Sequence, residues 1–104
     1  MTSQNQTLAP HQAKPHEVNV RVQYPAAEKP YHAHLDPTTT VGQLKLEVLR
    51  TFGLMDGAAE DGGTVHYELV YERSKLSDPN QTLGQLLGGH PEAKFTLTQF
   101  ITQG

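Results

Sequence analysis

Residues 69–83 read LVYERSKLSDPNQTL, and they carry the most informative pattern in the chain. Residues 69–71 are the last of a run in which apolar side chains occupy every second position. This alternation is typical of a strand with one buried face. Lys75-Leu76 is expected to add a short strand, and Asp78-Pro79-Asn80 has the composition of a turn. Thr82 then caps a short helical turn that ends at Gly88-Gly89.

One amphipathic helix is predicted before this stretch, over residues 41–52. Thr40 with Gln43 three positions later fits a capping box, and Thr39 is the alternative N-cap. Gly53 suits the left-handed residue that closes a helix. Between these ends the apolar residues recur at helical spacing on one stripe, which consists of Val41, Leu44, Val48, Leu49 and Phe52.

Alternating patterns predict the remaining strands. Residues 18–24 and 31–35 form a hairpin, and residues 95–101 form the last strand. Residues 54–64, rich in glycine and acidic side chains, are expected to be a mobile loop. Five strands and one helix share one core only if the helix lies across one face of the sheet. The predicted class is α+β, with a mixed sheet of four or five strands.

Composition indicates one small, slightly acidic domain. The chain has 104 residues, a formal net charge of −3 and no cysteine. The charge argues against a nucleic-acid surface, and the lack of cysteine excludes disulfides and thiolate chemistry. No apolar run reaches the roughly 20 residues of a membrane span, and the N-terminus does not resemble a signal peptide.

We therefore expect a cytoplasmic monomer that binds no cofactor, nucleic acid or membrane. Residues 1–16 are polar and contain two prolines, so they are predicted to be a disordered tail. Residues 17–99 are predicted to form the domain, and residues 100–104 a flexible C-terminal tail.

The order of these elements resembles the ubiquitin-like (β-grasp) proteins over about residues 18–104. Residues 36–45, DPTTTVGQLK, are similar to the stretch that leads into the single helix of that family. Thr82-Leu83 stands where the family has a Thr-Leu pair at the start of its short helical turn. The likeness extends to the divergent ubiquitin-like proteins of bacteria. It implies a protein modifier or a protein-binding module rather than an enzyme.

The resemblance also points to the C-terminus. When Phe95 and Leu97 are matched to the last-strand leucines of ubiquitin, Gly104 falls on the terminal glycine without a gap. The family implies conjugation of the Gly104 carboxylate to targets, with Ile101, Thr102 and Gln103 recognised as the tail. Implied partners are an E1-like activating enzyme, an E2-like conjugating enzyme and a JAB-type or other deconjugating protease. Gln103 replaces the penultimate glycine of ubiquitin.

The same matching implies a partner-binding surface and possible acceptor lysines. Val70 takes the position of the isoleucine at the centre of ubiquitin's apolar patch, and Thr96 and Thr98 take neighbouring positions. Ala26 or Ala27 replaces the leucine of the first turn. If chains form, the acceptors are among Lys14, Lys29, Lys45, Lys75 and Lys94.

Other functions stay open or are weakly supported. Many β-grasp domains bind partners through a sheet face or an edge strand without conjugation. A sulfur carrier, whose tail becomes a thiocarboxylate, typically ends in Gly-Gly, unlike this chain. His32 and His34 share a strand face, and His66 could join them, but spacing sets no third metal ligand. No rigid acid, base or nucleophile constellation indicates catalysis.

Overall fold

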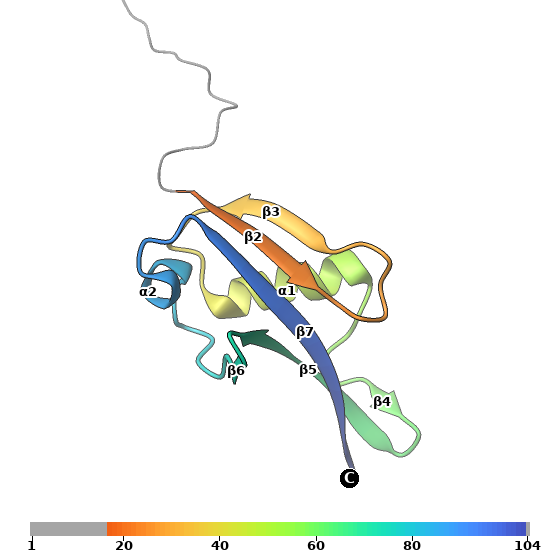
Figure 1. Ribbon diagram of the computed structural model, residues 1–104. Helices are drawn as coiled ribbons and strands as arrows, with labels where there is room; N and C mark the ends of the chain where they lie inside the picture. The colour runs from red at the N-terminus through yellow and green to blue at the C-terminus, as the bar shows by residue number, and fades with distance from the viewer. Residues whose placement is uncertain (1–16, 104) are drawn as a thin grey trace, which may run out of the picture.

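The computed structural model describes residues 17–103, which form one twisted sheet with a helix across one face (Figure 1). The predicted tail 1–16, which includes Lys14, lies outside the described residues, and so does Gly104. The elements in chain order are β2 (Val18–Gln23), β3 (Tyr31–Leu35), α1 (Val41–Phe52), β4 (Ala59–Glu60), β5 (Gly63–Tyr71), β6 (Ser74–Lys75), α2 (Leu83–Leu87) and β7 (Glu92–Gln103).

The sheet is mixed, with strand order β3-β2-β7-β5-β4 and with β6 paired to β5. β2 and β3 form the expected antiparallel hairpin. β2 and β7 lie side by side in parallel at the centre, and β7 pairs antiparallel with β5 on its other side. The predicted class is confirmed, and the sheet has six strands rather than four or five because β4 is added.

The helix α1 has the boundaries that the sequence predicts. The side chain of Thr40 accepts a hydrogen bond from the Gln43 N–H, and the Gln43 side chain accepts one from the Thr40 N–H. Gly53 closes the helix at φ 70°, a conformation that glycine adopts without a steric penalty. Thr82 and Gln85 form the same capping box at the start of α2.

The residues just before each helix accept a hydrogen bond from the first backbone N–H of the other helix. In α1 the Val41 N–H donates to the Gln81 carbonyl at 2.8 Å, and in α2 the Leu83 N–H donates to the Thr39 carbonyl at 2.9 Å. Thr40 and Thr82 form an isolated β-bridge between these bonds. Since the first N–H groups of a helix have no partner within it, this exchange fixes α2 beside the start of α1.

The core lies between α1 and the inner face of the sheet. Odd-numbered positions of β5 and β7 point inward, and even-numbered positions of β2 do the same. α1 supplies four buried side chains to this layer, as its apolar stripe predicts. The largest fully buried side chains are Leu44, Leu69, Leu83, Leu97, Val20, Val22 and Val48. Within residues 17–103, no helix is long and apolar enough to cross a membrane.

The expected mobile loop 54–64 is partly wrong, because residues 59–63 form a hairpin with β5. Glu60 pairs with Gly63 across a two-residue turn, in which Asp61 has φ 49° and Gly62 has φ 79°. Two positive φ values match the twist of a tight hairpin, and Asp-Gly is a preferred sequence for them. Hydrogen bonds between Val65 and residues 57 and 58 extend the pairing.

The C-terminal boundary also differs from the expectation. β7 runs to Gln103, and residues 100–103 pair in register with residues 66–63 of β5. The sequence predicts alternation only as far as residue 101 and a flexible tail from position 100, so the strand is longer than predicted. The β4–β5 hairpin lengthens β5 at this end of the sheet, and the lengthened strand supplies backbone partners that a free tail would lack.

Candidate protein-binding face and C-terminal strand

The sheet face that points away from α1, here called the outer face, carries the three predicted surface residues. Val70 pairs directly with Thr96 across β5 and β7, and Thr98 follows two positions along β7. Thr96 is exposed, whereas Val70 and Thr98 are partly buried. The Thr98 hydroxyl donates to the Glu68 carbonyl at 3.3 Å. The structure therefore brings the three residues together on one face.

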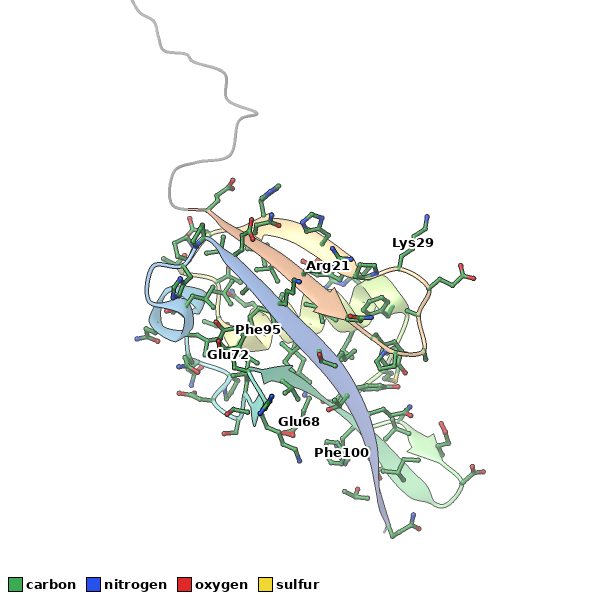
Figure 2. The ribbon with its side chains drawn as sticks, in the orientation of Figure 1. Arg21, Lys29, Glu68, Glu72, Phe95 and Phe100 are labelled. Carbon is green, nitrogen blue, oxygen red and sulfur yellow. The ribbon has the colours of Figure 1, made fainter. Side chains whose placement is uncertain are left out.

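An aromatic cluster lies beside them and was not singled out as a site from the sequence. The His66 and Phe100 rings stack at 5.2 Å between centroids, and Lys75 Nζ lies 5.6 Å from the centre of the Phe100 ring. Phe100 is 39% exposed, and Figure 2 shows it on the C-terminal half of β7. An exposed aromatic with a cation beside it is a common component of protein-binding surfaces.

The predicted tail residues lie at the exposed end of β7. Ile101, Thr102 and Gln103 are exposed, although each pairs with a residue of β5. His66 Nε2 lies 3.1 Å from the Thr102 hydroxyl oxygen, which adds a side-chain contact to the backbone pairing. The C-terminal strand is therefore accessible on its surface but held in the sheet.

The Asp56 carboxylate links β5 to α1. Its Oδ1 accepts a hydrogen bond from the Tyr67 N–H at 3.0 Å, and its Oδ2 lies 2.9 Å from Lys45 Nζ of α1. Burial raises the pKa of this carboxyl, but the Lys45 and Tyr67 hydrogen bonds and the charges of Lys45 and His66 outweigh it and lower the pKa below its ordinary value. Asp56 is therefore ionised in the folded chain near neutral pH.

The possible acceptor lysines differ in their surroundings. Lys45 is partly buried and paired with Asp56. Lys75 is exposed, 3.8 Å from Glu68 and beside Phe100. Lys29 and Lys94 are exposed, and Figure 2 shows Lys29 on the turn between β2 and β3. An amine that attacks a thioester must be neutral and accessible, so Lys29 and Lys94 are better placed than Lys45.

The histidines that suggested a metal pair lie together on the outer face of β3. The His32 and His34 rings are 5.9 Å apart, and His32 Nε2 makes a hydrogen bond with the Asn19 side chain. His66 lies on β5, beyond β2 and β7 in the sheet. Among residues 17–103 no three His, Cys, Asp or Glu side chains form a cluster able to hold a metal ion.

The architecture defines a ubiquitin-like β-grasp fold, and comparison with solved structures agrees. The chain superposes on ubiquitin of Caldiarchaeum subterraneum with a TM-score of 0.62 and 21% identity, over 85% of this chain and 99% of the other. The ubiquitin-like domain of yeast Ddi1 gives a TM-score of 0.62 and 14% identity, over 89% and 100%. Neither a protein-family model nor a curated protein matches the sequence.

Two features of this surface could have been found in the sequence. Asp61-Gly62 is a strong hairpin signal, and it would have placed β4 against β5. Phe100 continues the outward phase set by Thr96 and Thr98, so period-two alternation already places it on the outer face. Its contact with His66 required the register between two strands that lie far apart in sequence.

Proposed function

We propose that this chain is a protein modifier that is conjugated to target proteins through the carboxylate of Gly104. The observation that supports the proposal is the course of β7, which carries five consecutive exposed residues, 99–103, beyond the end of β2. Within residues 17–103, the backbone of this part of the chain pairs with one strand, β5. An activating enzyme could therefore reach the chain end without disturbing the core.

The chemistry assigns the chain the role of a substrate. An E1-like enzyme would adenylate the Gly104 carboxylate with ATP and release pyrophosphate. A thiol of the enzyme would then displace AMP to form a thioester, which an amine of the target attacks, with release of the thiol. Glycine suits this position because a side chain would crowd the carbonyl carbon under attack. An E2-like carrier and a JAB-type or other deconjugating protease complete the proposed set of partners.

The pairing of β7 with β5 imposes one requirement on this function. Residues 100–103 would leave β5 if an enzyme binds them as an extended strand in a channel. That release would break the His66 contacts with Phe100 and Thr102. The outer face, with Val70, Thr96, Thr98 and the exposed Phe100, would remain the docking surface for the enzymes and for partners that read the conjugate.

Conjugation is tested by mass spectrometry on the chain expressed in its native cells with an N-terminal tag. Lys94 is the last lysine or arginine in the sequence, so trypsin leaves residues 95–104, FTLTQFITQG, attached to each modified amine. We expect this remnant on target lysines, and we expect it to be absent when Gly104 is deleted. Recovery of the wild-type chain only as a free protein would refute conjugation.

The second candidate is a non-covalent interaction module, and the paired state of residues 100–103 favours it. A strand held in a sheet presents a defined surface, and the stack of His66 on Phe100 is part of that surface. Phe100→Ala should then abolish partner capture, whereas deletion of Gly104 should leave it unchanged. A mass increase corresponding to sulfur in place of oxygen at the chain end would instead indicate a sulfur carrier.

A further inference from the structure

The C-terminal part of β7 has one side without a strand. β2 pairs with β7 only as far as Gln23 opposite Thr96, whereas β5 continues to pair with it as far as Gln103. Among the residues that the structure describes, 97–103 therefore have β5 on one side and no paired strand on the other. Figure 1 shows β7 running past the end of β2 toward the C-terminus.

The hydrogen bonds of β5 identify which backbone groups face this open side. The Val65 and Tyr67 N–H groups donate to residues on the side away from β7, namely Ala58 and Asp56. The even-numbered residues of β5 therefore bond to β7, and their partners in register are even-numbered as well. It follows that Gln99 and Ile101 direct their N–H and C=O groups away from β5, toward the open side.

The side chains along this edge do not protect it from another strand. Residues 95–104 contain no charged residue and no proline, although both are common devices that keep strand edges from pairing with each other. Threonine, phenylalanine and isoleucine in this segment favour extended backbone. Exposed edges of this kind are ready templates for strand addition.

We propose that this edge pairs with the same edge of a second copy of the chain, antiparallel, about a two-fold axis at Phe100. The open stretch 97–103 has Phe100 at its midpoint, so the two copies match over its whole length. Gln99 of one copy then faces Ile101 of the other, and the backbone groups of both point at each other. Phe100 of one copy faces Phe100 of the other. The two form a non-hydrogen-bonded pair, because the N–H and C=O groups of Phe100 already point toward β5.

The side chains of this register are compatible with the pairing. Thr98 faces Thr102 of the second copy on the outer face, and Thr–Thr and aromatic pairs across strands are favourable. Uncharged residues face uncharged residues, so two chains of net charge −3 meet along a segment without like-charge repulsion. A two-fold axis of this kind uses the same patch on both subunits, which is the commonest symmetry of protein dimers.

The end of the second strand also has a place to lie. Residue 103 of the second copy falls opposite Leu97, where Tyr24, Pro25, Ala26 and Leu97 to Gln99 line a depression of about 330 Å³. β2 occupies the position beside Thr96, so the added strand ends there. This pairing does not depend on conjugation of Gly104, and the tests below use the unconjugated chain.

The first test compares two substitutions at one residue by sedimentation velocity across a wide concentration series. Gln99→Pro removes an N–H that faces the second copy, whereas Gln99→Ala removes the same side chain and keeps that N–H. We expect concentration-dependent dimers for the wild type and Gln99→Ala, and monomers for Gln99→Pro with its thermal unfolding transition retained. A wild type that stays monomeric at every concentration, or a Gln99→Pro dimer as stable as that of Gln99→Ala, would overturn the proposal.

The second test measures the register by disulfide formation, because the chain has no native cysteine. Phe100→Cys places two thiols at the two-fold axis, where facing residues of a non-hydrogen-bonded pair have Cα atoms about 4.5 Å apart, within disulfide range. The control Thr96→Cys lies on the same face of β7 but between β2 and β5. We expect rapid cross-linking only for Phe100→Cys. Equal rates for both variants would overturn the proposed register.

Discussion

The side chain of Ile101, which pairs with Val65, reaches across to Gly63 so closely that a side chain on Gly63 has no space. A Cβ atom placed on Gly63 would come within 2.7 Å of Ile101 Cγ2 and within 2.8 Å of the Thr102 carbonyl oxygen. The second of these contacts is with backbone, which does not move aside as a flexible side chain does. Gly63 is therefore the residue that allows the end of β7 to close onto β5.

Gly63→Ala should detach the end of β7 from β5 and leave the domain folded. The added methyl group forces Ile101 and Thr102 away, and only the last pairs of the β5–β7 ladder depend on that approach. We expect faster amide hydrogen exchange at Thr102, whose N–H faces β5, and unchanged protection at Thr96 and Thr98, which face β5 nearer the centre of the sheet. Thr64→Ala, at the next position of β5, is the control and should retain slow exchange at Thr102, because it keeps the backbone partner and adds no atom toward β7.

Acid should destabilise the fold in part through Asp56. Its pKa is lowered from an ordinary value of 3.8, so the folded chain binds fewer protons than the unfolded chain. The stabilisation is complete above that ordinary value and is lost as pH falls through the lower pKa of the folded state. Urea denaturation at a series of pH values should show a smaller loss of stability in acid for Asp56→Asn than for the wild type.

Lys45 provides the matched test of that assignment. If the ion pair of Lys45 and Asp56 causes much of the acid dependence, Lys45→Gln should reduce it in the wild type and have no further effect on it in Asp56→Asn. Independent, additive effects of the two substitutions on the pH profile would contradict this assignment.

Two leucines of α1 should respond very differently to truncation. Leu44 is fully buried against the sheet, whereas Leu46 is 65% exposed. Leu44→Ala is expected to lower the free energy of unfolding by about 2–5 kcal/mol, through lost burial and the cavity that remains. Leu46→Ala should change it by less than about 0.5 kcal/mol. Chemical denaturation measures both, and similar losses would mean that α1 packs on the sheet with another face.

The β5–β6 turn should be stabilised by glycine. Tyr71 and Ser74 pair across a turn in which Glu72 has φ 51° and Arg73 has φ 70°. A side chain at such φ values costs roughly 1–2 kcal/mol, which glycine avoids, although glycine also gains freedom in the unfolded chain. Arg73→Gly is therefore expected to raise the free energy of unfolding by about 0.5–1 kcal/mol. Arg50→Gly, the same change inside α1, should lower it by about 1 kcal/mol.

The predictable elements were those whose signals are local. The capping box of Thr40 and Gln43 and the closing residue Gly53 set both ends of α1, and the structure has the same ends. Thr82 and Gly88 do the same for α2. Each signal lies within one turn of the helix that it bounds, so no tertiary information was needed.

The sequence predicted some of the residues on the outer face, and it predicted correctly that they share that face. Val70, Thr96 and Thr98 share one face because alternate residues of a strand point to the same side. The cluster of His66, Phe100 and Lys75 joins three strands, so the sequence shows its members but not their contact. The binding role of both groups remains a prediction.

The order of the elements, the ends of both helices and the buried face of each long strand follow from local sequence signals, because caps and periodicity act over a few residues. The pairing of residues 100–103, by contrast, is a property of the tertiary structure. That pairing depends on backbone hydrogen bonds to β5, which no side-chain pattern encodes, and on the missing side chain at Gly63, which matters only once Ile101 reaches across to it.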